Sequence, residues 1–162
     1  MRRVHLVGHS GHGKTTLTVA LIEHWTAVGL RVGSIKHTRH VHELDTPGKD
    51  SWRQRQAGAS PAAIIAGDRL ALHLPLQVAD DPYALLAPHY VGCDLILVEG
   101  DVETAAPKVE VWRAGLSVPP LASERVGIRA IITEDQTSLL LEHWSRQDLP
   151  RLATRILELT DA

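Results

Sequence analysis

A glycine-rich segment near the start of the chain constrains the fold more than any other feature. It has the sequence Gly8-His9-Ser10-Gly11-His12-Gly13-Lys14-Thr15, which fits the pattern G-x-x-x-x-G-K-[ST]. A short apolar run, Val4 to Val7, precedes it, and an amphipathic segment follows from Thr15. A strand, a glycine-rich turn and a helix N-terminus together form a cradle of backbone N–H groups for phosphate oxygens.

Within such a cradle the last two residues of the pattern have defined tasks. Lys14 reaches the β and γ phosphates, and the hydroxyl of Thr15 holds Mg²⁺. We therefore predict that the chain binds a nucleotide through this phosphate loop, with contacts from Gly8, Ser10, Gly11, His12, Gly13, Lys14, Thr15 and Thr16.

Length and composition are those of one ordinary globular domain. At 162 residues the chain can bury a core without disulfides, so we expect a single domain over residues 1–162. The formal net charge of −2 gives no electrostatic reason to expect nucleic acid or an anionic membrane as a partner. The apolar run after Arg3 ends too soon for a signal peptide, no stretch is long enough to span a bilayer, and the lone Cys93 suits a reducing compartment. We expect a cytoplasmic protein.

The scarcity of lysine points to particular positions. Only four of the 17 basic residues are lysines, so arginine serves wherever a positive charge merely solvates the surface. A compact ammonium group fits a phosphate or a tight pocket that the planar guanidinium does not enter. We therefore regard all four as candidate site residues: Lys14, Lys36, Lys49 and Lys108. For Lys108, a chance survivor of the compositional bias is an equally good interpretation.

Hydrophobic periodicity predicts an α/β fold with a mostly parallel, twisted sheet flanked by helices. The helix after the phosphate loop is expected to run from Lys14 to Val28, where Gly29 ends it, and Arg31–Lys36 is expected to be the second strand of a βαβ unit. Apolar runs at 61–66 and 70–74 predict an antiparallel hairpin or adjacent strands. Other strands are predicted at 94–98, 108–113 and 126–132, and other helices at 49–57, 82–88 and from Asp148 onward.

A carboxylate at the end of a buried strand is the expected partner of the phosphate loop. The run Leu95-Ile96-Leu97-Val98-Glu99 is apolar until its last residue. A carboxylate in that position accepts from Mg²⁺-bound water or binds the ion directly. We predict Thr15 and Glu99 as the metal ligands, with an acid that only solvates the strand end as the alternative.

Two aspartates in or just after the polar segment 37–48 are candidate catalytic residues. This segment follows a predicted parallel strand, and ligands of α/β sheets bind at the carboxyl ends of such strands. Asp45 or Asp50 would contact Mg²⁺ or orient the attacking water, and the spacing does not choose between them. An Asp50 that merely caps the following helix is the alternative.

Two weaker patterns concern a transition metal and the base of the nucleotide. In His37-x-x-His40-x-His42, three imidazoles could converge on zinc or nickel if the segment folds back. The N-K-x-D motif that reads guanine in many GTPases is absent from the sequence, but Thr133-Glu134-Asp135 ends the last predicted strand at a comparable place. Asp135 is our candidate acceptor for the N1 and N2 donors of guanine, although the sequence alone does not separate guanine from adenine.

Together these residues resemble the molybdopterin-guanine dinucleotide biosynthesis accessory protein B family, often called MobB. The resemblance covers most of the chain. Its most specific parts are Gly48-Lys49-Asp50-Ser51 with Arg53 and Ala57-Gly58-Ala59, and Pro107-Lys108-Val109-Glu110-Val111 with Arg113. The chain departs from the family pattern where Asp101 and Val102 replace an aromatic residue and a lysine, and where His9 and His12 replace small residues of the phosphate loop.

The resemblance implies a P-loop NTPase fold that binds GTP and Mg²⁺ and is usually a homodimer. It implies an accessory, or adapter, protein with weak GTPase activity at most. Such a protein assists a guanylyltransferase of the MobA type in joining GMP to molybdopterin during molybdenum cofactor biosynthesis. The basic residues Lys36, His37, Lys49, Arg53 and Lys108 would then meet molybdopterin or a second nucleotide. The alternatives are a nickel-insertion type metallochaperone GTPase that uses the histidine cluster, and a small-molecule P-loop kinase.

Overall fold

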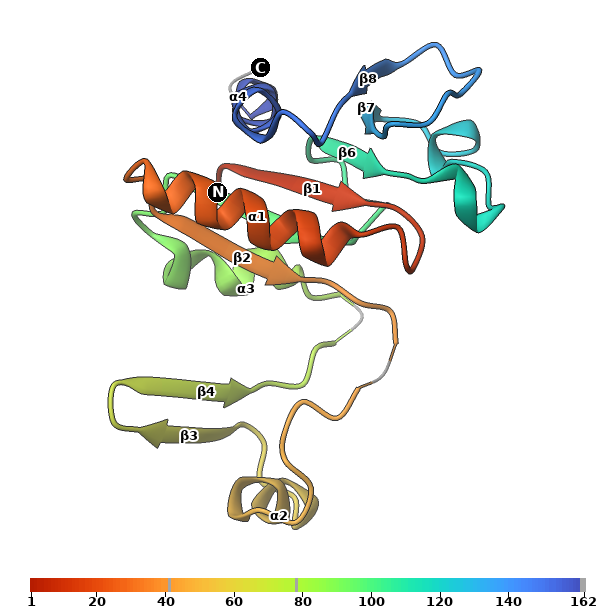
Figure 1. Cartoon of the computed structure of the whole chain (residues 1–162). Helices are drawn as coiled ribbons and strands as arrows, with labels where there is room; N and C mark the ends of the chain where they lie inside the picture. Colours follow the sequence, from red (N-terminus) through yellow and green to blue (C-terminus); the bar gives the residue numbers. More distant parts are fainter. Residues whose placement is uncertain (41, 78, 161–162) are drawn as a thin grey trace. The chain divides into compact units, whose positions relative to one another are not determined.

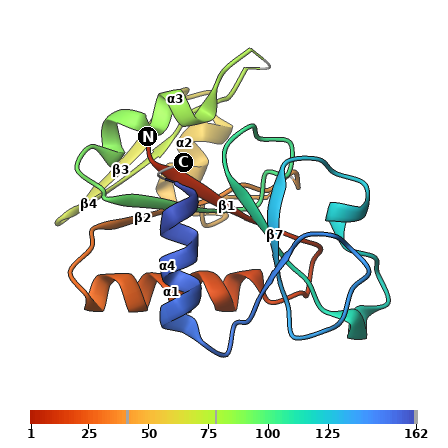
Figure 2. The ribbon, with the colours of Figure 1, turned by 90° about the horizontal axis from the view of Figure 1, so that it is seen from above.

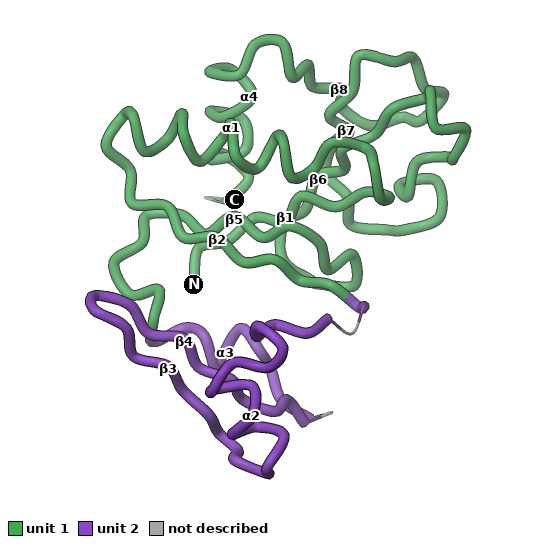
Figure 3. The backbone as a smooth tube through the Cα atoms, turned by 60° about the horizontal axis from the view of Figure 1, so that its bottom comes forward, with its two compact units in different colours: residues 1–38, 89–162 green, residues 39–88 purple. Residues whose placement is uncertain are grey.

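A computed structural model of the chain describes residues 1–40, 42–77 and 79–160, which divide into two compact units (Figure 3). Unit 1 comprises Met1–Thr38 and His89–Ala162, and unit 2 comprises Arg39–Pro88. Each unit is described by itself below. The single GTP-binding domain expected from the sequence stays a prediction.

Unit 1 is built on a six-stranded sheet whose neighbouring strands all run parallel (Figure 1). Its strands are β1 (Arg3–Val7), β2 (Val32–Lys36), β5 (Leu95–Glu99), β6 (Lys108–Val111), β7 (Ile128–Ile132) and β8 (Glu142–Trp144). Their order across the sheet is β2-β5-β1-β6-β7-β8, which confirms the predicted parallel architecture. Since the strands are parallel, the segments that follow β1, β2 and β5 through β8 all leave the sheet at one edge.

One face of this sheet packs against two helices, α1 (Lys14–Ala27) and α4 (Leu149–Leu159) (Figure 2). The apolar core lies between them and is formed mainly by alternate strand residues with Leu21, Trp25 and Ile156 from the helices. As expected, Gly29 follows the end of α1 with a φ of 90°. Asp148 caps α4 by accepting from the backbone N–H of Arg151 at 3.1 Å.

The strand residues that point to the opposite face include three buried polar side chains: His5, Lys108 and Glu110. Loop segments with two short 3₁₀ helices, η2 (Ala114–Leu116) and η3 (Leu121–Ser123), lie in the part of the chain after β6. Glu110 accepts from the N–H groups of Leu121 and Ala122 at 2.6 and 2.9 Å, which fixes η3 over the sheet. Polar side chains thus hold loops on the face that the helices leave uncovered.

Unit 2 contains a short helix and a separate antiparallel hairpin. Its elements are α2 (Asp50–Gln56), β3 (Ala62–Ala66), β4 (Arg69–His73) and α3 (Pro82–Leu86), followed by the 3₁₀ turn η1 (Ala87–Tyr90). The strands β3 and β4 pair from Ala62 opposite His73 to Ala66 opposite Arg69, around a turn at Gly67. This confirms the predicted antiparallel hairpin.

Across both units, none of the described helices is long and apolar enough to cross a membrane.

Candidate functional site

The phosphate loop joins β1 to α1 at the carboxyl edge of the sheet. Gly8, Gly11 and Gly13 all adopt positive φ angles, of 140°, 81° and 91°. A Cβ atom on Gly8 would lie 2.4 Å from the carbonyl oxygen of Val111, so only glycine fits where the loop leaves β1 beside β6. Gly13 is the N-cap of α1, which places the unpaired first amides of the helix at the loop. The predicted phosphate-binding residues from Gly8 to Thr16 therefore lie in one continuous segment, made of the loop and the first turn of α1.

The predicted metal ligands Thr15 and Glu99 meet directly. The Thr15 hydroxyl lies 2.9 Å from each carboxylate oxygen of Glu99. They meet because β5, which ends in Glu99, is the neighbour of β1 in the sheet. A hydroxyl and a carboxylate are hard oxygen donors of the kind that Mg²⁺ prefers, so this pair fits a magnesium ion.

Two lysines surround this pair. The ammonium of Lys14 donates to the carbonyl oxygen of His9 at 2.7 Å, and that of Lys36 lies 3.5 Å from Oε1 of Glu99. Burial lowers the pKa of Lys14 from its ordinary value, the charge of Glu99 opposes this shift, and the charge of Lys36 adds to it. Four predicted site residues thus form one charged cluster at the β2–β5 side of the loop.

The segment after Glu99 is fixed by a histidine that the sequence analysis did not single out. The Nδ1 atom of His5 lies 3.1 Å from the carbonyl oxygen of Gly100, and Nε of Arg3 donates to Nε2 of His5 at 3.3 Å. The ring is therefore neutral with its proton on Nδ1, in agreement with burial, which lowers the pKa of His5 to about 4. The sequence does carry a sign of this role, because His5 is the one polar residue in the otherwise apolar run 4–7.

The chain turns sharply after Glu99. Gly100 has a φ of 102°, and a Cβ there would lie 2.3 Å from the carbonyl oxygen of His37, so the turn requires glycine. Asp101 follows with a φ of 60°, a conformation that aspartate tolerates better than most residues. The Oδ2 atom of Asp101 lies 3.7 Å from Nδ1 of His37. His37, a predicted contact residue for molybdopterin or a second nucleotide, therefore lies beside Asp101, which departs from the family pattern.

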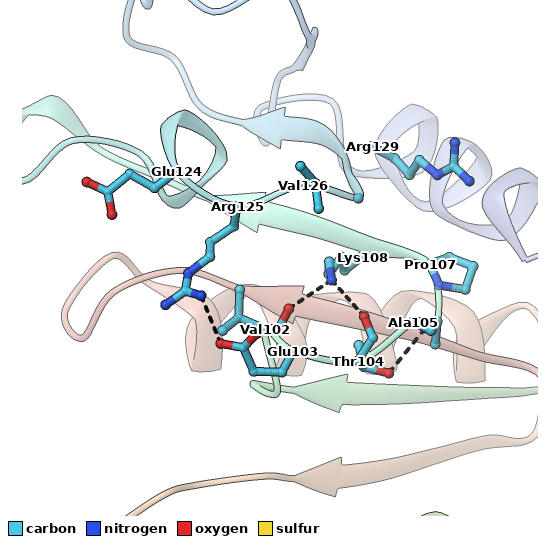
Figure 4. Close-up of a pocket in the computed structure, with 12 residues that line it drawn as sticks. Val102, Glu103, Thr104, Ala105, Pro107, Lys108, Glu124, Arg125, Val126 and Arg129 are labelled. Atoms are coloured by element: carbon cyan, nitrogen blue, oxygen red, sulfur yellow. Dashed lines mark hydrogen bonds and ion pairs between the residues drawn. The ribbon is translucent and has the colours of Figure 1, made fainter.

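Lys108 contacts the segment after Glu99 rather than the phosphate loop. It is buried, and its ammonium donates to the carbonyl oxygens of Val102 and Thr104 at 2.8 and 2.7 Å (Figure 4). It lines a cavity of about 440 Å³, at which Arg125 pairs with Glu103 at 3.2 Å. Backbone carbonyls occupy two of the three donors of this ammonium, and a role for Lys108 in binding a ligand stays a prediction.

Polar residues also gather on the other side of the loop, where β6, β7 and β8 end. Oδ2 of Asp135 accepts from the backbone N–H of Ala114 at 2.8 Å. The carboxylate of Glu134 accepts from the Ser145 hydroxyl at 2.9 Å and from the backbone N–H of Arg146 at 2.8 Å. A cavity of about 390 Å³ is lined here by Arg113, Gly115, Glu134, Asp135 and Arg146. Of these five residues, only Asp135 was predicted from the sequence to contact the nucleotide.

His12 connects the phosphate loop to this second side. Its ring is buried, and Nδ1 accepts from the backbone N–H of Arg113 at 3.0 Å. Burial lowers the pKa of His12, and the nearby charges of His9, Lys14 and Arg113 act in the same direction. The ring is therefore neutral, and its replacement of a small residue adds a bond between the loop and the end of β6.

The other predicted site residues, Asp45, Lys49, Asp50 and Arg53, belong to unit 2. Oδ1 of Asp45 accepts from the Ser51 hydroxyl at 3.0 Å, and its Oδ2 lies 3.7 Å from Nε of Arg55 and 3.8 Å from Nε2 of His73. Asp45 therefore joins the polar segment of unit 2 to α2 and β4. Asp50 lies in the first turn of α2 directly after its N-cap Lys49. Roles for these residues at the phosphate loop stay predictions.

The histidine cluster shows limited convergence. The rings of His40 and His42 lie 5.9 Å apart between centroids. Within residues 1–40, 42–77 and 79–160, no group of three or more His, Cys, Asp or Glu side chains is arranged to hold a metal ion.

Comparison with known proteins gives a consistent family. The family model "MobB: Molybdopterin guanine dinucleotide synthesis protein B" matches residues 3–134. The molybdopterin-guanine dinucleotide biosynthesis adapter protein of Haemophilus influenzae is 37% identical over 116 residues, and that of Escherichia coli is 38% identical over 114 residues. These alignments cover 70% and 68% of this chain and 65% of each relative, so the chain spans somewhat less than two thirds of their length.

The fold has the same relatives. The crystal structure of Bacillus subtilis MobB superposes with a TM-score of 0.75 at 27% sequence identity, over 97% of this chain and 96% of that one.

Proposed function

Since the chain belongs to the molybdopterin guanine dinucleotide synthesis protein B (MobB) family, we propose that it is a cytoplasmic GTP-binding adapter protein of molybdenum cofactor biosynthesis. In this role it assists a MobA-type guanylyltransferase in joining GMP to molybdopterin. The observation that carries the proposal is the contact of Thr15 with Glu99 beside Lys14, because this arrangement suits a magnesium-bound nucleoside triphosphate.

Different residues around the loop contact different parts of the nucleotide. The amides of the loop and of the start of α1 bind the phosphate oxygens, and Lys14 exchanges its bond to the His9 carbonyl for the β and γ phosphates. Thr15 and Glu99 would hold Mg²⁺, which neutralises charge on the phosphates when bound. Lys36 balances the charge of Glu99 at the same edge.

Hydrolysis by this site should be slow. Around the loop in the described part of unit 1, Glu99 is engaged by Thr15 and Lys36, and Asp101 lies beside His37. Neither carboxylate is left to orient an attacking water efficiently, so weak GTPase activity at most is expected. Asp45 and Asp50 remain candidates for that task.

The test of this function is calorimetric titration with GTP and ATP in Mg²⁺ buffer, followed by reconstitution with the guanylyltransferase and molybdopterin. Lys14→Ala should lower affinity for GTP roughly 100-fold, because it removes a buried charge-assisted contact to phosphate. The matched control is Arg125→Ala, a half-exposed cation at the other cavity, which should leave GTP affinity unchanged. Wild-type protein, but not Lys14→Ala, should stimulate formation of the guanine dinucleotide. If both stimulate it equally, the adapter role of the nucleotide site is wrong.

We further propose that the adapter is a homodimer joined through the hairpin of unit 2. Its strands expose large apolar side chains, with Ile65 79%, Leu70 63% and Leu72 45% exposed. Exposed apolar hairpins with open edges favour pairing with another chain. Sedimentation of Ile65→Asp should show a monomer, whereas Val91→Asp, an equally exposed position in unit 1, should leave the dimer intact. A monomeric wild type would contradict the proposal.

A further inference from the structure

The layout of the sheet indicates which way a bound nucleotide must lie, given the proposed function on which this inference rests. The residues suited to Mg²⁺ and the γ phosphate, Thr15, Lys36 and Glu99, lie on the β2–β5 side of β1. The nucleoside end must therefore extend across the start of α1 toward the ends of β6, β7 and β8. The cavity of about 390 Å³ lies at those ends.

Two arginines, which follow the ends of β6 and β8, converge at this place. Measured from the position that a Cβ on Gly13 would occupy, Nη2 of Arg113 lies at 2.7 Å and Nη1 of Arg146 at 3.4 Å. Both guanidinium groups therefore lie beside one another and beside the last glycine of the phosphate loop. The charge of Arg113 acts unfavourably on Arg146 and the charges of Glu134 and Asp135 act favourably on it, so the cavity combines cationic donors with carboxylate acceptors.

The backbone of each arginine is fixed by a hydrogen bond that its N–H group donates to a side chain. The N–H of Arg113 donates to the buried ring of His12, and the N–H of Arg146 donates to Glu134. Glu134 also accepts from the neighbouring Ser145 hydroxyl, so it acts as a positioning residue for Arg146. Asp135 lines the same cavity, which thus presents donors and a carboxylate together.

We propose that Arg113 and Arg146 are specificity-determining residues that donate hydrogen bonds to O6 and N7 of guanine. Guanine carries two acceptors on that edge, whereas adenine carries a donor amino group in place of O6. The planar guanidinium matches the pair of acceptors, and Asp135 lies in the same cavity to accept from the opposite N1 and N2 donors. Arginine in place of lysine is therefore required here, in contrast to position 14.

The test is calorimetric titration of the full chain with GTP, ATP and 7-deaza-GTP, which lacks the N7 acceptor. Arg113→Ala and Arg146→Ala should each weaken GTP binding about tenfold and change ATP binding less than about threefold, because only the guanine contact is removed. Wild-type protein should bind 7-deaza-GTP several-fold more weakly than GTP. Arg146→Lys should not restore selectivity. The control variant is Arg125→Ala, at the other cavity.

Each contrary outcome has a distinct meaning. Equal losses for GTP and ATP in the arginine variants would overturn the inference, and so would an unchanged preference for GTP. If the alanine variants melt far below the wild type, the comparison of GTP with 7-deaza-GTP on wild-type protein decides alone, and equal binding overturns the inference. A wild type that binds no nucleotide, or a Lys14→Ala variant that binds normally, would instead refute the proposed function.

Discussion

The two sides of the phosphate loop are built in opposite ways. On the β2–β5 side, Lys14, Thr15 and Glu99 come from a contiguous motif and from the end of the adjacent strand. On the β6–β8 side, Arg113, Asp135 and Arg146 come from three strand ends and are held by bonds to backbone amides. We call the first, with Lys14, Thr15 and Glu99, the motif side, because its residues belong to a common phosphate-binding pattern. We call the second, with Arg113, Asp135 and Arg146, the assembled side, because it depends on how the loops of this chain cover the sheet.

The difference teaches where each kind of specificity resides. The motif side responds to phosphate and metal and carries no information about the base. The assembled side lies where the base must be, and its geometry depends on loops attached through buried polar residues such as Glu110. Substitutions on the first side should therefore change phosphate and metal binding, and those on the second side should change base selection.

The largest effect is expected from loosening the covering loop of the assembled side. Glu110→Ala removes a buried carboxylate and leaves the partly buried N–H groups of Leu121 and Ala122 without their acceptor. The free energy of unfolding should fall by about 3–5 kcal/mol, measured by denaturant titration at pH 7. Glu110→Gln, which keeps one acceptor oxygen, should lose less. An alanine variant within about 1 kcal/mol of the wild type would mean that the loop is not held by this carboxylate.

Acid should destabilise the fold through His5, which contacts the segment after Glu99. Its pKa is about 4 in the folded protein and 6.5 in the unfolded chain. As the pH falls from 6.5 to 4, the unfolded chain binds the proton first, so stability present above pH 6.5 is lost, by about 3 kcal/mol. Unfolding curves of wild type and His5→Gln between pH 7.5 and 4 measure this loss by difference, which cancels the contribution of His12, whose pKa is also lowered by burial. Parallel curves would contradict the assignment.

A metal-specific effect of intermediate size is expected from Glu99→Gln. The amide keeps the size of the side chain but removes the charge that faces Thr15 and Lys36. Mg²⁺ should then strengthen GTP binding about tenfold less than in wild type, while binding in EDTA changes little. Titrations with and without Mg²⁺ measure both. An equal loss in EDTA would assign Glu99 to the fold rather than to the metal.

The smallest effect should come from Lys36→Ala. Its ion pair with Glu99 is 3.5 Å long and its side chain is 66% exposed, so solvent screens the attraction. Stability should change by less than about 1 kcal/mol, and GTP and ATP affinity should fall together by less than about fivefold. Thermal melting and the same titrations check this. A loss of affinity for GTP alone, or for ATP alone, would mean that the motif side also contributes to base selection.

The sequence predicted the motif side well because its chemistry depends on local spacing. The pattern from Gly8 to Thr15 places a lysine and a hydroxyl next to a helix start, and an acid at the end of an apolar run has few other places to lie in a parallel sheet. The hairpin was one of the two predicted arrangements, since two short apolar runs flank the turn residues Gly67-Asp68.

The assembled side was largely missed for physical reasons. β8 has only three residues, too few for any periodicity, so the position of Arg146 after it could not be inferred. Glu134 and Arg146 meet through a backbone bond that composition does not reveal. The scarcity of lysine singled out Lys108, but sequence cannot distinguish a phosphate from the backbone carbonyls that its ammonium contacts.

The bond from the Arg113 amide to the His12 ring has a consequence for how a nucleotide arrives. It ties the middle of the phosphate loop to the end of β6 through a bond that involves no ligand, and so restrains the conformation of the loop. A segment already ordered has little configurational entropy left to lose, and nucleotide capture should need no slow rearrangement of the loop. Association at this loop should then be governed by the rate of encounter, and differences in affinity should appear as differences in residence time.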